Sequence, residues 1–229
     1  MSIGKPVRSR IPALGRNVVS GRRHTFTGYV PSTKVGNDHQ LIAYESLLER
    51  DFIQLLEDDD EVESYRDRSE AVIWTDESGA EHRSLPDFDV LKRNGVRICV
   101  EVKPFERIER KRLRPLYAMV EKAAIASGRF HRFEIWTDRE IRRPIPLYNA
   151  ELRNIGRLDE FDHSASISVI GALRAASGSC TIRELRLRSG LDAGSFRAVV
   201  ASLAERRIIM ADNALAIDDD CVVALEAVA

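Results

Sequence analysis

The stretch SLPDFDVLKRNGVRICVEVKP, residues 84–104, decides the fold of this chain. Asn94-Gly95 at its centre is a strong signal for a tight hairpin turn. We therefore predict one strand over 84–92 and a second over 96–103. In the second strand apolar and polar residues alternate, so one face packs on a core and the other carries side chains free for chemistry.

Three charged side chains meet on this hairpin. Pairing across the turn brings Asp87 close to Glu101, and the period of two places Lys103 on the same face as Glu101. Magnesium prefers oxygen ligands, commonly one or two carboxylates with waters and phosphate oxygens. A neighbouring lysine can orient or deprotonate a water and stabilise negative charge during phosphodiester hydrolysis. The trio therefore predicts a metal-dependent hydrolytic site with Asp87 and Glu101 as ligands.

A helix upstream of the hairpin supplies a further carboxylate. Residues 39–57 carry an apolar stripe at three- and four-residue spacing, so we predict a helix there with Asp38 as its N-cap. Glu49 on this helix can act as a catalytic and metal-ligating carboxylate, and Glu45, one turn earlier, is the competing choice.

Further elements surround the hairpin on both sides. We predict strands over 71–75 and 130–137 and a long helix over 106–127, which Pro115 kinks or divides. The resulting order is helix, three strands, helix, strand, which indicates an α/β fold with a mixed sheet.

From Ser164 onward the pattern changes to short helices. A helix over 164–176 is followed by a second from Thr181, where Glu184 has capping-box spacing, and a third that Asp192 caps. A predicted hairpin around Asp212-Asn213 completes the pattern helix, helix, turn, helix, hairpin. That pattern is typical of a small winged helix-turn-helix domain.

Charge is segregated along the chain although it nearly cancels overall. There are 35 lysines and arginines against 36 aspartates and glutamates. The first 40 residues and the segment 103–114 are basic, whereas residues 57–61, Glu-Asp-Asp-Asp-Glu, form an uninterrupted stretch of acids that we call the acidic run. Basic patches suit a phosphate backbone. We predict DNA contacts at Lys34, Arg107, Arg110, Lys111 and Arg112.

Composition excludes several classes of protein. With 44% hydrophobic and 31% charged residues the chain is globular in character. No apolar stretch is long enough for a membrane span, and no apolar stretch follows the basic N-terminus, so we expect neither a membrane anchor nor a signal peptide. The three cysteines lie far apart, which argues against disulfides and a zinc site. The cysteines thus favour a reducing compartment.

The motifs together resemble a known superfamily. Pro86-Asp87, then Glu101-Val102-Lys103, with a helical glutamate upstream, resembles the PD-(D/E)XK nucleases. The segments 44–68 and 133–142 extend the likeness to the TnsA-type transposon endonucleases over roughly residues 30–150. That family has its helical glutamate in a Ser-x-x-Glu context, which maps onto Ser46 to Glu49 and favours Glu49 over Glu45.

The resemblance implies a fold, an activity and partners. It implies a restriction-endonuclease-like αβββαβ core and a Mg²⁺-dependent endonuclease, with Mn²⁺ as a substitute, that cuts the non-transferred strand at transposon ends. The implied partners are transposon-end DNA, a TnsB-like transposase and a TnsC-like AAA+ ATPase. The implied location is cytoplasmic, at the nucleoid DNA of a prokaryote. We expect a basic N-terminal arm, a nuclease domain, a linker and a winged-helix domain that contacts DNA or protein; their ranges are 1–38, 39–150, 151–163 and 164–229.

Two other functions fit the same residues. One is a restriction, repair or junction-resolving nuclease of the same superfamily, which the neighbouring genes would distinguish from a transposon enzyme. The other is a non-catalytic DNA-binding adaptor with a degenerate nuclease fold. The joint presence of Asp87, Glu101 and Lys103 counts against the adaptor.

Overall fold

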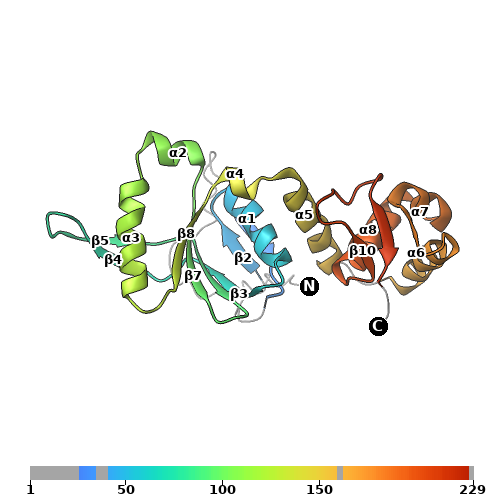
Figure 1. Ribbon diagram of the computed structural model, residues 1–229, viewed down its shortest axis with the longest axis horizontal. Coiled ribbons are helices and arrows are strands. Elements are labelled where there is room, and N and C mark those ends of the chain that lie inside the picture. Colours follow the sequence, from blue (N-terminus) through green and yellow to red (C-terminus); the bar gives the residue numbers. More distant parts are fainter. Residues whose placement is uncertain (1–25, 35–40, 159–161, 227–229) are drawn as a thin grey trace, which may run out of the picture.

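A four-stranded mixed sheet lies at the centre of the N-terminal half (Figure 1). The computed structural model describes residues 26–34, 41–158 and 162–226. The strands, in their order across the sheet, are β3 (Val62–Asp67), β6 (Phe88–Lys92), β7 (Arg97–Val102) and β8 (Arg132–Trp136). Neighbours are antiparallel except β7 and β8, which are parallel. The chain is therefore a mixed α/β protein, as predicted.

The predicted hairpin of residues 84–104 forms the middle of this sheet. The turn at Asn94-Gly95 is present, and Gly95 has a φ of 81°, a conformation that glycine adopts without strain. Phe88 pairs with Val100, so the register places Asp87 opposite Glu101. Strand β6 is shorter than predicted and begins at Phe88, just after Pro86-Asp87.

Helices cover both faces of the sheet. On one face, α1 (Leu47–Asp58) packs its Phe52 ring against Phe88 and Trp136, with ring centroids 5.3 and 5.2 Å apart. On the other face, α3 (Arg114–Ala126) lies in a second core that includes Cys99 of β7. The predicted alternation of β7 is confirmed, because its even-numbered valines face α1 and its odd-numbered residues face α3.

The helix predicted over 39–57 is wrong at its start. Residues Leu41–Tyr44 form strand β2, which pairs with β1 (Gly28–Pro31), and α1 begins only after Ser46. The Ser46 hydroxyl caps the helix by accepting a hydrogen bond from the Glu49 N–H at 3.2 Å. The helical spacing of apolar residues continues upstream into residues 41–44, but there the pairing with β1 decides the structure. The predicted cap Asp38 lies outside the described residues, as do 1–25 and 35–37 of the predicted arm.

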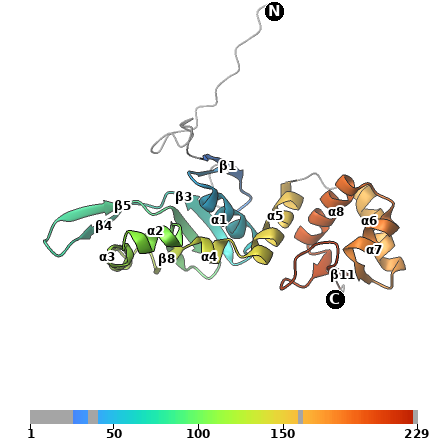
Figure 2. The same ribbon diagram turned by 90° about the horizontal axis from the view of Figure 1, so that it is seen from above.

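Residues 71–75 do form a strand, but not one of the central sheet. Strand β4 (Val72–Thr75) pairs with β5 (Glu81–Ser84) in a hairpin that projects from the molecule at the end opposite the C-terminal helices (Figures 1 and 2). The third antiparallel strand of the sheet is β3, which follows the acidic run and was not predicted. Its polar sequence VESYRD hides the strand, because Val62 and Tyr65 are its only apolar residues.

The predicted helix over 106–127 is divided, as Pro115 suggested. It forms α2 (Phe105–Arg110) and α3, and the break falls at Arg112, which has a left-handed φ of 51°. Pro115 stands in the first turn of α3, where its missing N–H costs nothing. The break turns α3 back across the sheet.

The predicted linker over 151–163 is wrong for its first half. After the short helix α4 (Asp138–Ile141), a continuous helix α5 runs over Pro144–Leu158. Proline opens this helix rather than breaking it. Gly156 lets α5 approach α8 so closely that an added Cβ would lie 2.2 Å from the Ala201 backbone. The segment is therefore a packed helix that belongs to the C-terminal core.

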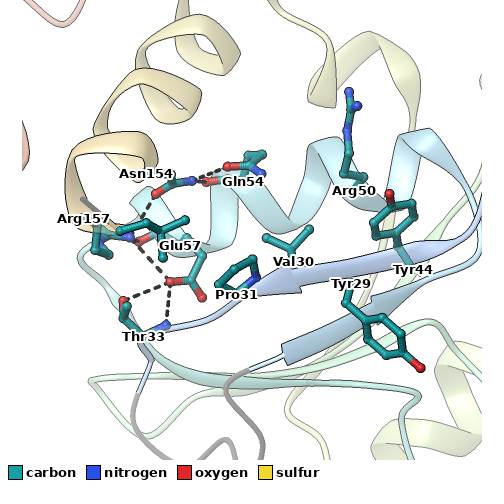
Figure 3. A pocket seen from close by; sticks show the side chains of 11 residues that line it. Tyr29, Val30, Pro31, Thr33, Tyr44, Arg50, Gln54, Glu57, Asn154 and Arg157 are labelled. Atoms are coloured by element: carbon teal, nitrogen blue, oxygen red, sulfur yellow. Dashed lines mark hydrogen bonds and ion pairs between the residues drawn. The ribbon is translucent and has the colours of Figure 1, made fainter. Parts of the chain in front are cut away.

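The opposite side of α5 is bound to α1 by polar contacts (Figure 3). Arg153 donates two hydrogen bonds of 2.6 Å to the Asp58 carboxylate. Arg157 donates at 2.7 Å to the Glu57 carbonyl and at 3.2 Å to Glu205 of α8. A cavity of about 230 Å³ beside these contacts is lined by residues of β1, α1 and α5. Two residues of the acidic run, Glu57 and Asp58, therefore help to hold α5 in place.

Three helices and a small sheet complete the C-terminal part. They are α6 (His163–Ala175), β9 (Ser179–Thr181), α7 (Ile182–Ser189), α8 (Ala193–Glu205), β10 (Ile209–Ala211) and β11 (Val222–Leu225). The predicted caps are confirmed: Thr181 and Glu184 form a capping box, and Asp192 caps α8. The predicted hairpin partner is wrong, because β10 pairs with β11 rather than with the residues just after Asn213.

None of the helices in the described ranges combines the length and the apolar character needed to cross a membrane.

Candidate active site

Asp87, Glu101 and Lys103 meet at one edge of the sheet, as the register predicted. The Lys103 ammonium lies 3.2 Å from Asp87 Oδ2 and 2.8 Å from Glu101 Oε1. All three side chains are largely buried, with 21, 12 and 22% of their surfaces exposed. Asp87 comes just before β6, whereas Glu101 and Lys103 come from the end of β7 and just after it. The sequence thus places two acids around one cation.

Each carboxylate has one oxygen occupied by donors and one oxygen open. Asp87 Oδ2 accepts from the Val102 N–H at 2.8 Å as well as from Lys103. Glu101 Oε1 accepts from the Tyr117 hydroxyl at 3.2 Å as well as from Lys103. Within the described residues, Asp87 Oδ1 and Glu101 Oε2 have no donor. These two oxygens can ligate a metal ion without breaking the bonds that hold the side chains.

The electrostatics of the site follow from burial and from the close approach of the acids. Burial, together with the negative charge of Asp87, raises the pKa of Glu101 above its usual value. Burial alone would lower the pKa of Lys103, but Asp87 and Glu101 outweigh burial, and the pKa of Lys103 lies above its usual value. Excess negative charge in a partly buried place is what a divalent cation relieves.

Glu49 lies near enough to Asp87 and Lys103 for their charges to act on it, whereas Glu45 pairs with Arg68. Burial raises the pKa of Glu49, and the charge of Asp87 adds to that rise while Lys103 opposes it, so the three groups share one electrostatic environment. The Ser46 hydroxyl and the Glu45 N–H hold the Glu49 carboxylate at 3.0 and 2.7 Å. The Glu45 carboxylate is instead exposed and pairs with Arg68 at 2.9 Å. We use the name carboxylate cluster for Glu49, Asp87, Glu101 and Lys103.

The cluster suits a lightly ligated metal better than a closed metal cage. Among the described residues no three His, Cys, Asp or Glu side chains stand in position to hold a metal together. Two carboxylates with open oxygens suit Mg²⁺, which usually keeps several water ligands and also binds phosphate oxygens of the substrate. Asp87 and Glu101 therefore fit such an ion as ligands, with Glu49 beside them.

Asp89 lies on the same sheet face as Asp87 but has a structural role. It is 4% exposed and pairs with Arg66 at 2.8 Å and with Arg97. Both arginines come from neighbouring strands. Because its charge is fully compensated, Asp89 helps to hold three strands together rather than to bind a ligand.

Four of the five predicted DNA contacts follow Lys103 closely in the chain. Arg107 and Arg110 are on α2, which begins two residues after Lys103, and Lys111 and Arg112 follow the helix directly. All four are exposed, and none has an acidic partner within the described ranges. The fifth, Lys34, lies elsewhere: its ammonium donates to the Asp59 carbonyl at 2.9 Å, at the far end of α1 from Glu49.

The structure adds one residue that the sequence did not single out. Tyr117 of α3 is 8% exposed, and its hydroxyl reaches Glu101. Burial first and Glu101 second raise the pKa of Tyr117 above its usual value. Its position inside the helix predicted over 106–127 gives no sign of a bond to Glu101.

No protein-family model matches this chain, and no curated protein is significantly similar to it.

Proposed function

We propose that this chain is a Mg²⁺-dependent DNA endonuclease that hydrolyses a phosphodiester bond at transposon ends, as the TnsA-like subunit of a heteromeric transposase. The convergence of Asp87 and Glu101 on Lys103 at the edge of the sheet is the observation that carries this proposal. Basic, unpaired side chains beside the site supply the means to hold a phosphate backbone.

The order of elements supports a restriction-endonuclease-like core. Helix α1, strands β3, β6 and β7, helix α3 and strand β8 follow one another as in an αβββαβ core, with the β4–β5 hairpin inserted and α2 added. The C-terminal helices α6 to α8 and their small sheet have the order of a winged helix. We assign the nuclease activity to the first part and contacts with DNA or protein partners to the second.

Each residue of the carboxylate cluster has a separate task in this mechanism. Asp87 and Glu101 would hold the ion through Oδ1 and Oε2, and Glu49, whose carboxylate feels the charges of Asp87 and Lys103, would add negative charge nearby. A bound divalent cation would supply an activated water and neutralise charge on the phosphate. Lys103 presents its positive charge to the negative charge that develops in the transition state. The arginines and lysine after Lys103 position the backbone of the DNA.

The activity needs restraint and partners. A nuclease that cut any DNA would damage its host, so we expect the isolated chain to be nearly inactive and cleavage to require a TnsB-like transposase and a TnsC-like ATPase. Robust cleavage of arbitrary plasmid by the purified chain would contradict this part of the proposal.

A reconstituted excision reaction tests the function. Transposon-end DNA, Mg²⁺ and both partners are combined with wild type, Asp87→Asn, Glu49→Gln or Glu45→Gln. Both cluster variants should lose cleavage by about 10²-fold or more, because each removes charge from the metal site. Glu45→Gln should cut like wild type, since its carboxylate pairs only with Arg68 in the described structure. Wild-type cleavage by Asp87→Asn would refute the assignment.

A further inference from the structure

The hydroxyl of Tyr117 has a role that packing does not explain. The ring lies in the core between α3 and the sheet, tilted against Phe133 with ring centroids 6.0 Å apart. That core also contains Phe130, so a phenylalanine ring without a hydroxyl would pack there as well. Burying a hydroxyl is unfavourable unless it is hydrogen-bonded. Its bond in the described structure goes to Glu101 Oε1.

The position of Tyr117 depends on the broken helix before it. The left-handed residue Arg112 stands between α2 and α3 and lets α3 turn back over the sheet face that carries Glu101. Tyr117 lies in the first turns of α3, so its ring enters the core while its hydroxyl points to the edge where β7 ends. The ring is fixed by packing, and the hydroxyl therefore has little freedom to move away.

Tyr117 and Lys103 bind the same oxygen of Glu101. Lys103 approaches Oε1 at 2.8 Å and Tyr117 at 3.2 Å, from two different elements. Two donors on one oxygen fix the rotation of the carboxylate and leave Oε2 without a donor among the described residues. Lys103 alone would fix the Glu101 carboxylate less firmly, because its ammonium also binds Asp87.

We propose that Tyr117 is a positioning residue that orients the Glu101 carboxylate for a divalent cation and so sets the affinity of the site for that cation. This inference rests on the proposed function, because it assumes that Asp87 and Glu101 bind a metal ion. Hydrogen-bond partners of metal ligands commonly contribute 10- to 100-fold in affinity, about the size of effect expected here.

The test compares two tyrosines that both donate to a glutamate. Tyr65 is 1% exposed and its hydroxyl donates to Glu57 at 2.7 Å, far from the carboxylate cluster. Mn²⁺ alone is titrated into wild type, Tyr117→Phe and Tyr65→Phe, and unbound Mn²⁺ is followed by its electron paramagnetic resonance signal. Thermal unfolding without metal establishes that each variant is folded.

Tyr117→Phe should raise the Mn²⁺ dissociation constant about tenfold or more, and Tyr65→Phe should leave it within about twofold of wild type. In the excision reaction, Tyr117→Phe should need more Mg²⁺ for half-maximal cleavage and recover at saturating Mg²⁺. Wild-type Mn²⁺ affinity in Tyr117→Phe would overturn the positioning role and leave the nuclease proposal intact. Absence of Mn²⁺ binding by wild type would overturn both.

Discussion

Two groups of acids in this chain have similar composition and opposite surroundings. The acidic run of residues 57–61 lies at the end of α1, and the carboxylate cluster lies near the start of the same helix. In the run, Glu57 and Asp58 face Arg157 and Arg153, and Asp59 faces Lys92. In the cluster, Asp87 and Glu101 share one lysine, and Glu49 is bonded by Ser46 and the Glu45 N–H.

The difference concerns charge compensation rather than the number of acids. Each carboxylate of the run that is buried meets a cation or several donors: Glu57 accepts from Ser32, Thr33 and Tyr65. The run therefore stabilises the docking of α5, whereas the cluster retains negative charge and open oxygens that a ligand can use. An acidic stretch conspicuous in the sequence is thus structural, whereas the scattered acids Asp87 and Glu101 keep the open oxygens that the proposed metal site needs.

The largest effect is expected when one lysine in each group of acids is replaced by methionine. Lys103 and Lys92 are equally buried, at 22 and 21% exposure, and each contacts two acids. Lys103→Met should reduce reconstituted cleavage by about 10²-fold or more, because it removes the positive charge beside the reacting phosphate. Lys92→Met should lower stability and leave cleavage unchanged. Equal losses of cleavage in the two variants would contradict the difference between the carboxylate cluster and the acidic run.

The next effect concerns the close contact of α5 with α8. Gly156→Ala should destabilise the protein by about 3 kcal/mol, since its Cβ would lie 2.2 Å from the Ala201 backbone. Gly171→Ala in α6 is the control: nothing lies within 4 Å of its added Cβ, and alanine should stabilise that helix by up to about 1 kcal/mol. Urea unfolding measures the free energy of unfolding of both variants. An unchanged value for Gly156→Ala would contradict the close contact between α5 and α8.

A smaller effect is expected where the acidic run holds α5. Arg153→Met leaves Asp58 without its bidentate partner at a place where both side chains are under 20% exposed. We expect a loss of about 2 kcal/mol, less than for a fully buried pair. Cleavage per folded molecule should stay at the wild-type level, and a loss of activity without a loss of stability would show that the run takes part in the chemistry.

The smallest effect is expected at the rim of the same region. Arg207 pairs with Asp60, but the two side chains are 59 and 69% exposed. Arg207→Ala should change stability by no more than about 0.5 kcal/mol, because exposed ion pairs are screened by water and salt. A cost equal to that of Arg153→Met would mean that exposure does not decide the strength of these contacts.

The sequence predicted the placement of Asp87, Glu101 and Lys103 better than the elements around them. The turn at Asn94-Gly95 and the strand period fix Asp87 opposite Glu101, because both are local rules. Strand β2 was missed since Leu41 and Tyr44 fit a helical spacing equally well, and only pairing with β1 decides between them. Strand β3 was missed because its partners are distant in the chain.

Long-range contacts also explain the other failures. Residues 151–158 looked like a linker after two prolines, yet Gly156 and Arg153 join them to α8 and α1. Tyr117 could be recognised as a core residue from its spacing, but its bond to Glu101 depends on the helix break at Arg112. Periodicity alone predicts neither which elements a helix packs against nor which group a buried hydroxyl bonds.

Anomalous scattering from crystals soaked in Mn²⁺ tests the central claim most directly, because it locates a bound ion without reference to activity. We predict a peak between the Asp87 and Glu101 carboxylates, lost in Asp87→Asn, and no peak at the acidic run. A peak at residues 57–61 with none between Asp87 and Glu101 would contradict it.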